Sequence, residues 1–234
     1  MSIIDQALSF IAPHHCYICK KEGSVCCQKC LLDLRIPSDE ISCYFCNRKE
    51  RNHDGICSSC RSKQYLDGVF WFSDYKNKYA AKLIKALKFN NVHEASRAIS
   101  NGISQTVPED ILLSANFITA IPTANKRVRA RGWDQAKLIS RYLSKSIKVP
   151  SKSLLVRLSS FDQIGATKQE RAEASERFFK PIRLSLISGS TIILVDDVLT
   201  TGSTLNSAAR ALKKAGANKV YAATFARQGL AKLK

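Results

Sequence analysis

The chain has 234 residues and carries 37 Lys and Arg against 19 Asp and Glu, a formal net charge of +18. This length allows one full α/β domain and a small additional module. No run of residues approaches the roughly 18 to 20 apolar side chains of a membrane-spanning helix, and the N-terminal segment has no basic start of the kind that secretion signals have. These features argue against a membrane-spanning or secreted protein, and we expect a cytoplasmic one.

The positive charge is concentrated in the C-terminal part of the chain. Residues 1–70 carry 9 basic and 8 acidic side chains, whereas the remainder carries 28 basic and 11 acidic ones. An excess of this size attracts phosphate-rich partners and exceeds what one small anion needs, so nucleic acid is a candidate partner. The alternative is a solvated basic surface that serves solubility.

All nine cysteines lie between residues 16 and 60, and eight of them form Cys-x2-Cys pairs. The pairs are Cys16 and Cys19, Cys27 and Cys30, Cys43 and Cys46, and Cys57 and Cys60. Two such pairs can supply the four thiolates of a structural Zn²⁺ site, so we predict one or two zinc ions in a double zinc ribbon. A disulfide framework is the alternative, which the odd cysteine count and the missing secretion signal disfavour.

The spacing of the cysteines leaves their pairing open. Sequential pairing joins the first two pairs and the last two, and the spacing alone does not exclude interleaved pairing. Cys26 and three nearby histidines, His14, His15 and His53, are alternative ligands. We expect any zinc here to be structural, because a site closed by four thiolates has no open position for a substrate.

A short amphipathic helix is expected at residues 2–11, and alternating strands and helices follow the cysteine region. We predict strands at 69–72, 117–122, 154–158, 192–195 and 219–225, and helices at 78–88, 92–106, 134–144 and 205–215. Residues 123–131 are expected to form a basic loop, and residues 162–180 a polar, charged stretch. This alternation predicts an α/β fold, a parallel sheet flanked by helices. We place the cysteine-rich module at 1–64 and the α/β domain at 65–234.

The segment 192–204 has the most specific sequence pattern in the chain. A buried strand leads into Asp196 and Asp197, and a small, hydroxyl-rich turn then precedes a helix. The turn residues are Thr200, Thr201, Gly202, Ser203 and Thr204. A strand–turn–helix junction directs backbone N–H groups and the positive end of the helix dipole at a phosphate, and the carboxylates can accept hydrogen bonds from a sugar diol or lie near hydrated Mg²⁺. An ordinary βα turn of a doubly wound fold is the alternative.

This segment resembles the signature of type I phosphoribosyltransferases for 5-phosphoribosyl-1-pyrophosphate (PRPP). The resemblance implies that Asp196 and Asp197 bind the ribose hydroxyls, that residues 200–204 bind the 5-phosphate, and that Mg²⁺ accompanies PRPP. It further implies that the basic loop grips the pyrophosphate, a role suited to Arg127 and Arg131. Lys85 and Lys88, on the helix at 78–88, could reach the same anion.

Taken over nearly the whole chain, the sequence resembles the ComF family of competence-associated, phosphoribosyltransferase-like proteins. Five blocks carry the resemblance: the cysteine pairs, LIKALKF at 83–89, IPTANKRVRARGWDQA at 121–136, QIGATKQERAEASERFF at 163–179 and the PRPP signature. Four positions depart from the patterns of related proteins. Trp133 and Asp134 stand where the family commonly has Phe and Asn, Ala174 replaces an Asn, and Leu199 is apolar where several catalytic relatives have a polar residue.

Three functions follow from these resemblances. The first is a ComF-type competence protein that binds PRPP and handles single-stranded DNA during natural transformation. The second is an active phosphoribosyltransferase in nucleotide or cofactor metabolism, for which no catalytic residue can be named. The third is a non-catalytic scaffold whose zinc ribbon recruits a helicase or a DNA-import channel.

Overall fold

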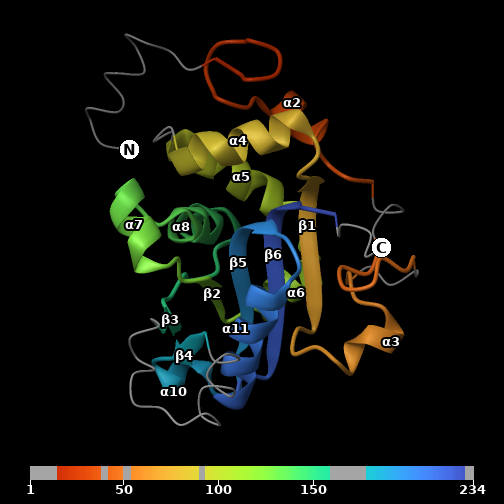
Figure 1. Cartoon of the computed structure of the whole chain (residues 1–234), viewed down its shortest axis with the longest axis vertical. Helices are drawn as coiled ribbons and strands as arrows, with labels where there is room; N and C mark the ends of the chain where they lie inside the picture. Colours follow the sequence, from red (N-terminus) through yellow and green to blue (C-terminus); the bar gives the residue numbers. More distant parts are fainter. Residues whose placement is uncertain (1–14, 38–41, 50–53, 90–92, 159–177, 230–234) are drawn as a thin grey trace.

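A computed structural model of the chain describes residues 15–37, 42–49, 54–89, 93–158 and 178–229. Its centre is a four-stranded, wholly parallel sheet in the spatial order β1-β6-β5-β2 (Figure 1). The strands are β1 (Gly68–Asp74), β2 (Phe117–Ala120), β5 (Thr191–Leu199) and β6 (Lys219–Arg227). A separate antiparallel pair is formed by β3 (Leu155–Arg157) and β4 (Phe179–Pro181). The predicted parallel sheet is therefore confirmed.

Helices cover both faces of the central sheet. The helices of the described residues are α2 (Gln28–Leu32), α3 (Ser58–Arg61), α4 (Lys78–Phe89), α5 (His93–Ser104), α6 (Glu109–Ser114), α7 (Asn125–Arg131), α8 (Gln135–Ile147), α10 (Leu184–Ile187) and α11 (Ser203–Lys214). One face packs against α4, α5 and α8, and the other against α11 (Figure 1). Apolar residues alternate along each strand between these two faces, as expected for a sheet buried on both sides.

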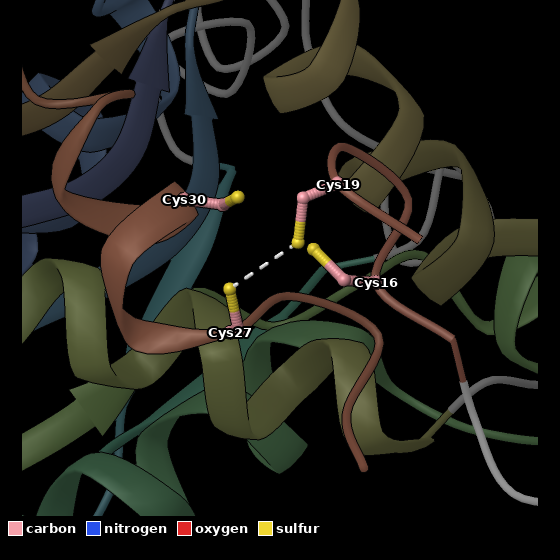
Figure 2. Close-up of side chains that lie close together, drawn as sticks. All are labelled: Cys16, Cys19, Cys27 and Cys30. Carbon is pink, nitrogen blue, oxygen red and sulfur yellow. Dashed lines mark hydrogen bonds between the residues drawn. The ribbon is translucent and has the colours of Figure 1, made fainter. Parts of the chain in front are cut away.

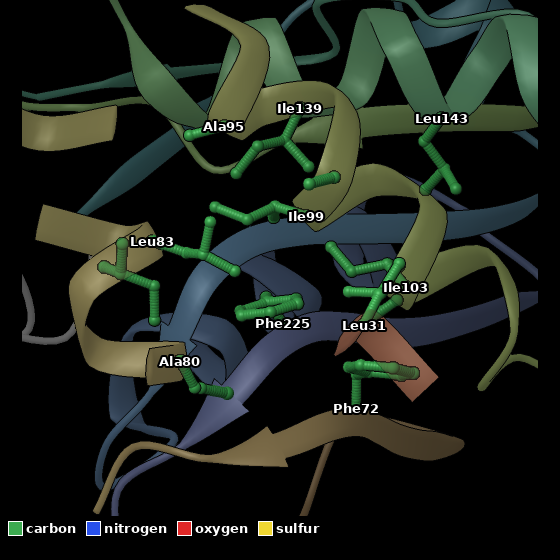
Figure 3. Close-up of a cluster of buried hydrophobic side chains, with 14 of the residues drawn as sticks. Leu31, Phe72, Ala80, Leu83, Ala95, Ile99, Ile103, Ile139, Leu143 and Phe225 are labelled. Atoms are coloured by element: carbon green, nitrogen blue, oxygen red, sulfur yellow. The ribbon is translucent and has the colours of Figure 1, made fainter. Parts of the chain in front are cut away.

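The core on the first face is built around two aromatic rings from neighbouring strands. Phe72 of β1 and Phe225 of β6 stack with their ring centroids 5.6 Å apart, and both side chains are fully buried (Figure 3). Helix α5 approaches these rings through Gly102, where an added Cβ would lie 2.9 Å from an atom of each ring. A side chain at this position would therefore hold the helix away from the sheet.

Each cysteine region packs against one face of the sheet. Cys16, Cys30 and Leu31 belong to the hydrophobic cluster of Phe72 and the α4/α5 face. Cys43, Tyr44, Cys57 and Cys60 belong to the cluster of the opposite face, with Trp71 of β1 and the buried side of α11. The side chains of β1 contribute to both clusters, so the cysteine-rich part and the sheet share their cores.

The expectation of a basic loop at residues 123–131 was wrong in one respect, because most of this segment is helix α7. Lys, Arg and Ala are good helix formers, and Gly132, with φ 84°, ends the helix in the left-handed conformation. The predicted helix at 2–11, His14, His53 and residues 159–177, including Ala174, lie outside the described residues. Within the part of the chain that is described, no helix has the length and apolar character needed to span a membrane.

Candidate functional site

The acidic pair lies near the carboxyl end of β5, at the edge of the sheet where the loops of parallel strands gather. Strand β5 runs through both residues to Leu199. Asp197 is buried, and its backbone N–H donates to Asp196 Oδ1 at 2.8 Å. A cleft at the carboxyl ends of parallel strands is the usual ligand position in open α/β sheets.

The charge of Asp197 is compensated by a lysine from the C-terminal turn of α4. Lys88 Nζ lies 2.6 Å from Asp197 Oδ2, whereas Lys85 is exposed on the outer side of the same helix. Trp133 fixes the neighbouring backbone, because its indole Nε1 donates to the carbonyl oxygen of Leu87 at 3.1 Å. Trp133 therefore serves as a packing anchor between α4 and the segment that precedes α8.

The environment of Asp196 opposes its ionisation. Desolvation by burial, followed by the negative charge of Asp197, raises the pKa of Asp196 well above its ordinary value of 3.8. The N–H of Asp197 and the charge of Lys88 act in the opposite direction but are smaller. A ligand that offers hydroxyl donors or a cation to this carboxylate would relieve the repulsion.

The turn after β5 has the geometry of an anion site. Gly202 is the N-cap of α11, with φ 76°, a left-handed conformation that suits glycine. Thr201 Oγ1 and Ser203 Oγ lie 2.9 Å apart, and the side chains of Thr200, Thr201 and Ser203 are exposed. The twelve-residue helix α11 begins at this turn, and the N–H groups of a first helical turn lack an intrahelical acceptor, so they can bind an anion; the Ser203 N–H donates to Thr201 Oγ1 at 3.4 Å.

The segment after β2 brings basic side chains to the same edge of the sheet. Arg127 is exposed on α7, and Arg131 Nη1 donates to Gln135 Oε1 at 3.0 Å. Asp134 holds this segment in place: its Oδ1 accepts from Thr123 Oγ1 at 3.0 Å and from the Lys137 N–H at 3.2 Å, which caps α8. A carboxylate at position 134 therefore fulfils a capping role.

The carboxyl end of β5, the turn before α11, the end of α4 and helix α7 line a cavity of about 290 Å³. Its lining contains both aspartates, three turn residues and four basic side chains. The residues concerned are Asp196, Asp197, Thr200, Gly202, Thr204, Lys88, Arg127, Arg131 and Arg157. Among the candidate residues from sequence, Thr201, Ser203 and Lys85 do not line the cavity. Arg157 of β3 was missed, because its strand belongs to the separate antiparallel pair and carries no motif.

The eight paired cysteines form two four-thiol groups, each made by sequential pairing. One group contains Cys16, Cys19, Cys27 and Cys30 (Figure 2), and the other Cys43, Cys46, Cys57 and Cys60. Within each group all sulfur atoms lie within 4.8 Å of one another, and all nine cysteines are free of disulfides. Four convergent thiols fit the tetrahedral site that structural zinc requires. Cys26 belongs to neither group, and His15 is exposed, 3.7 Å from Glu22.

The two groups repeat the same local backbone geometry. Lys20 and Asn47, four residues after the first cysteine of each group, have φ 65° and 61°. Cys27 and Cys57, the third cysteine of each group, are the N-caps of α2 and α3, with ψ 158° and 159°. This repetition indicates that both groups are built for the same ligand.

The thiols of each group differ in acidity. Although burial opposes it, hydrogen bonding, chiefly with the backbone of Cys19, Cys27 and Ile18, lowers the pKa of Cys16 to about 6. A hydrogen bond with Ser59 lowers the pKa of Cys57 to about 6. Burial raises the pKa of Cys60 to about 12. Each group therefore contains a thiol that ionises readily, and zinc binding must displace protons from others.

Comparison with known proteins agrees with this geometry. The family model of the phosphoribosyl transferase domain matches residues 131–234. The chain is 29% identical over 198 residues to competence protein ComFC of Bacillus subtilis, which covers 76% of this chain and 80% of that protein. It is 28% identical over 193 residues to competence protein F of Haemophilus influenzae, which covers 79% of this chain and 84% of that protein.

Two solved structures match more distantly. One is glutamine PRPP amidotransferase from B. subtilis with ADP and GMP, at TM-score 0.44 and 16% identity, covering 60% of this chain and 30% of its own. The other is an allosteric regulatory enzyme of purine biosynthesis, at TM-score 0.45 and 17% identity, covering 61% of this chain and 30% of its own.

The fold and the cysteine groups define a phosphoribosyltransferase-like protein with an N-terminal zinc-ribbon type module. The two competence proteins match over most of their length as well as most of this chain. The chain is similar to ComF-type competence proteins over most of its length.

Proposed function

We propose that this chain is a ComF-type competence protein that binds PRPP in the cavity between β5, α7 and α11. The observation that carries the proposal is the convergence of two adjacent carboxylates, the turn at the start of α11 and four basic side chains on one cavity. Its volume of about 290 Å³ is near the lower end of the range for small-molecule sites. Four other cavities lined by described residues lack this combination.

Each part of PRPP has a matching part of the cavity. The N–H groups at the start of α11 and the hydroxyl groups of the turn would hold the 5-phosphate. Asp196 and Asp197 would accept from the ribose hydroxyls, and Arg127 and Arg131 would hold the pyrophosphate. Mg²⁺ bound with PRPP would neutralise pyrophosphate charge, and oxygen ligands near Asp196 suit that ion.

A matched pair of variants tests this site by calorimetric titration of zinc-loaded protein with PRPP and Mg²⁺. We expect saturable binding by the wild type and none by the Asp196→Ala/Asp197→Ala variant. The control, Asp33→Ala/Asp110→Ala, removes two exposed carboxylates and should bind as the wild type does. Absence of wild-type binding would contradict the proposal.

A pyrophosphate-release assay on the same protein separates PRPP binding from turnover. Pyrophosphate release from PRPP with one of a panel of acceptors would make the chain an active phosphoribosyltransferase. Leu199, directly before the turn, is 1% exposed and apolar, so it has no group to activate an acceptor. We therefore expect binding without release.

The role in competence is supported by the names of the two relatives and by a basic surface along α8. This α8 basic surface is formed by Arg97, Lys137, Arg141, Lys145, Lys152 and Arg183. They line two adjoining cavities of about 280 and 900 Å³ that share Arg141 and Ser151, and neither lining contains an Asp or Glu. Tyr142 also lines the larger one. A basic groove with an aromatic side chain suits single-stranded nucleic acid.

Salt-dependent binding of a single-stranded oligonucleotide tests this second part. The Arg141→Ala/Lys145→Ala variant should weaken binding and lower the salt slope by about 1.4, since each phosphate contact on a single strand contributes about 0.7. The control Lys63→Ala/Lys76→Ala removes two exposed charges that lie outside both cavities. Equal losses of oligonucleotide affinity in the two variants would show that the net charge of the chain, and not the α8 basic surface, determines binding.

A further inference from the structure

The ring of Tyr44 lies directly against the phosphate-type turn. Tyr44 sits between Cys43 and Cys46 and is 1% exposed. A Cβ placed on Gly202, the N-cap of α11, would fall 2.4 Å from Cε2 and 2.9 Å from Cδ2 of this ring. The backbone of the turn and the tyrosine from the second cysteine group are thus in contact across 158 positions of sequence.

Tyr44 is fixed in this position from several directions. Its hydroxyl donates to Gln64 Oε1 at 2.6 Å, and its backbone N–H donates to the Gly55 carbonyl at 2.9 Å. Its own carbonyl accepts from Arg227 Nη2 at 3.2 Å, as does the carbonyl of Cys43.

Arg227 connects this tyrosine to the strand that enters the turn. It is the last residue of β6 and pairs in the sheet with Leu199, the last residue of β5. Its guanidinium lies 4.9 Å from the centre of the Trp71 ring and also contacts Asn47, within the same cysteine group. The strand end and the cysteine group are therefore held by one buried cation.

A separate contact joins the far end of the same group to α11. The N–H of Tyr65, five residues after Cys60, donates to Asn206 Oδ1 at 2.8 Å. Asn206 lies in the first turn of α11, and its N–H donates to the Gly202 carbonyl at 2.8 Å. The second cysteine group thus touches the turn on one side and the helix start on the other.

The first cysteine group makes a different set of contacts. Cys16 and Cys30 pack into the cluster on the α4/α5 face, and Tyr17 lies beneath Lys82 of α4. No residue from 199 to 206 belongs to that cluster among the residues that the structure describes. The two groups share their ligand geometry but differ in their connection to the turn, so each is a control for the other.

We propose that Tyr44 is a positioning residue through which the second cysteine group sets the shape of the phosphate turn. Metal at Cys43, Cys46, Cys57 and Cys60 closes the loop that carries Tyr44, and the ring then supports Gly202 in its left-handed conformation. Loss of that metal loosens the ring and the turn together. Metal binding and phosphate binding are therefore positively coupled, whereas the first group serves only the fold.

Hydrogen exchange of the peptide covering residues 199–206, followed by mass spectrometry, tests this coupling without a ligand. Cys46 and Cys19 are the exposed cysteines of their groups, so Cys46→Ser and Cys19→Ser are matched variants. With metal analysis confirming the loss of one zinc from each, we expect faster exchange of this peptide in Cys46→Ser only. Equal exchange in the two variants, or unchanged exchange in Cys46→Ser, would overturn the proposal.

A second pair of variants keeps all cysteines, in case Cys46→Ser does not fold. Tyr44→Phe retains the ring and loses only the bond to Gln64, while Tyr44→Leu removes the ring but keeps an apolar side chain. We expect faster exchange at 199–206 in Tyr44→Leu, near wild-type exchange in Tyr44→Phe, and a full zinc content in both. Wild-type exchange in Tyr44→Leu would contradict a positioning role.

The ligand part of the proposal rests on the proposed function and has its own readout. In titrations with PRPP and Mg²⁺, Tyr44→Leu should bind about tenfold more weakly than the wild type, a loss of about 1.4 kcal/mol. If the wild type does not bind PRPP, the proposed function fails while the exchange experiment still decides the coupling. If the wild type and Tyr44→Leu bind PRPP equally well, the coupling proposal is contradicted while the proposed PRPP binding stands.

Discussion

Asp196 is a residue whose chemistry conflicts with the stability of the fold. Its pKa is raised by burial and by Asp197, so the folded state holds its proton more tightly than the unfolded chain does. The resulting decrease in the free energy of unfolding is absent below the ordinary pKa of 3.8. It grows as the pH rises toward the pKa of Asp196 in the folded state. We expect Asp196→Asn, which carries no charge, to be more stable than the wild type at pH 8 and equal to it at pH 3.5.

Urea unfolding at these two pH values measures the difference, and PRPP titration should show that the same variant no longer binds. The control is Asp33→Asn, which removes an exposed carboxylate and should give no gain that grows with pH. An Asp196→Asn variant less stable than the wild type at pH 8 would contradict a destabilising charge on Asp196. A stabilising change that abolishes binding is the pattern expected of a functional residue.

Gly202 is required for two separate reasons, and a matched glycine distinguishes them. Its φ is 76°, and an added Cβ would collide with Tyr44, whereas Gly189 has φ 72° and no atom within 4 Å of its would-be Cβ. Gly189→Ala should therefore cost only backbone strain, about 1 kcal/mol, and Gly202→Ala clearly more. Thermal unfolding of the two variants compares them, and equal losses would mean that Tyr44 has room to move aside.

At the level of the site, sequence reasoning located the strand, the acidic pair and the turn because they are contiguous in the chain. It could not locate Arg157, or choose Lys88 over Lys85, because those depend on how α4 and β3 lie against β5. Contact between Tyr44 and Gly202 carries no local signal at all. Cysteine pairing remained open for the same reason, since spacing does not determine which pairs meet in space.

At the level of elements, helix α5 reaches the sheet only because residue 102 has no side chain. Alanine is the better helix former by about 1 kcal/mol, but its Cβ would lie 2.9 Å from atoms of both Phe72 and Phe225. These rings are fully buried and stacked, so the clash should cost about 1–3 kcal/mol. We expect Gly102→Ala to destabilise the protein in urea unfolding, against the direction that helix propensity predicts.

A neighbouring position on the same helix provides the control. Asn101 is partly exposed, and Asn101→Ala should raise stability by about 0.5 kcal/mol through helix propensity alone. If both variants were stabilised, α5 would have space to move away from the sheet, and the close contact at Gly102 would not determine its position.

The strands and most helices were predictable because their signals are local. Residues 192–195 are β-branched or apolar and all fully buried, as a central parallel strand requires. Residues 123–131 were misjudged because Pro122 and a run of basic side chains suggest a loop, although Lys, Arg and Ala also form helices well. The capping of α8 by Asp134 explains why a new helix begins at Gln135, three residues after Gly132.

At the level of the whole molecule, the two cysteine groups are attached to opposite faces of one sheet. Side chains of the first group share a cluster with Phe72 and those of the second a cluster with Trp71, and both aromatic residues belong to β1. A strand that contributes to both cores links the groups mechanically. Loss of either group should therefore lower the global stability of the sheet, although among the described residues only the second group contacts the turn after β5.

Zinc removal should accordingly lower a single unfolding transition. Binding at about 1,000 times Kd contributes about 4 kcal/mol, and about 2–4 °C per kcal/mol then gives a loss on the order of 10 °C. The loss should shrink as the pH falls from 8 to 6, because protons compete with zinc for thiols such as Cys60, whose pKa is raised to about 12. Scanning calorimetry with and without a chelator measures both effects.

The zinc content of two cysteine variants tests which thiols bind the metal. Cys26→Ser should retain the wild-type zinc content, and Cys30→Ser should lose one zinc. In calorimetry, two separate transitions in the zinc-loaded protein would mean that the cysteine groups and the sheet unfold independently.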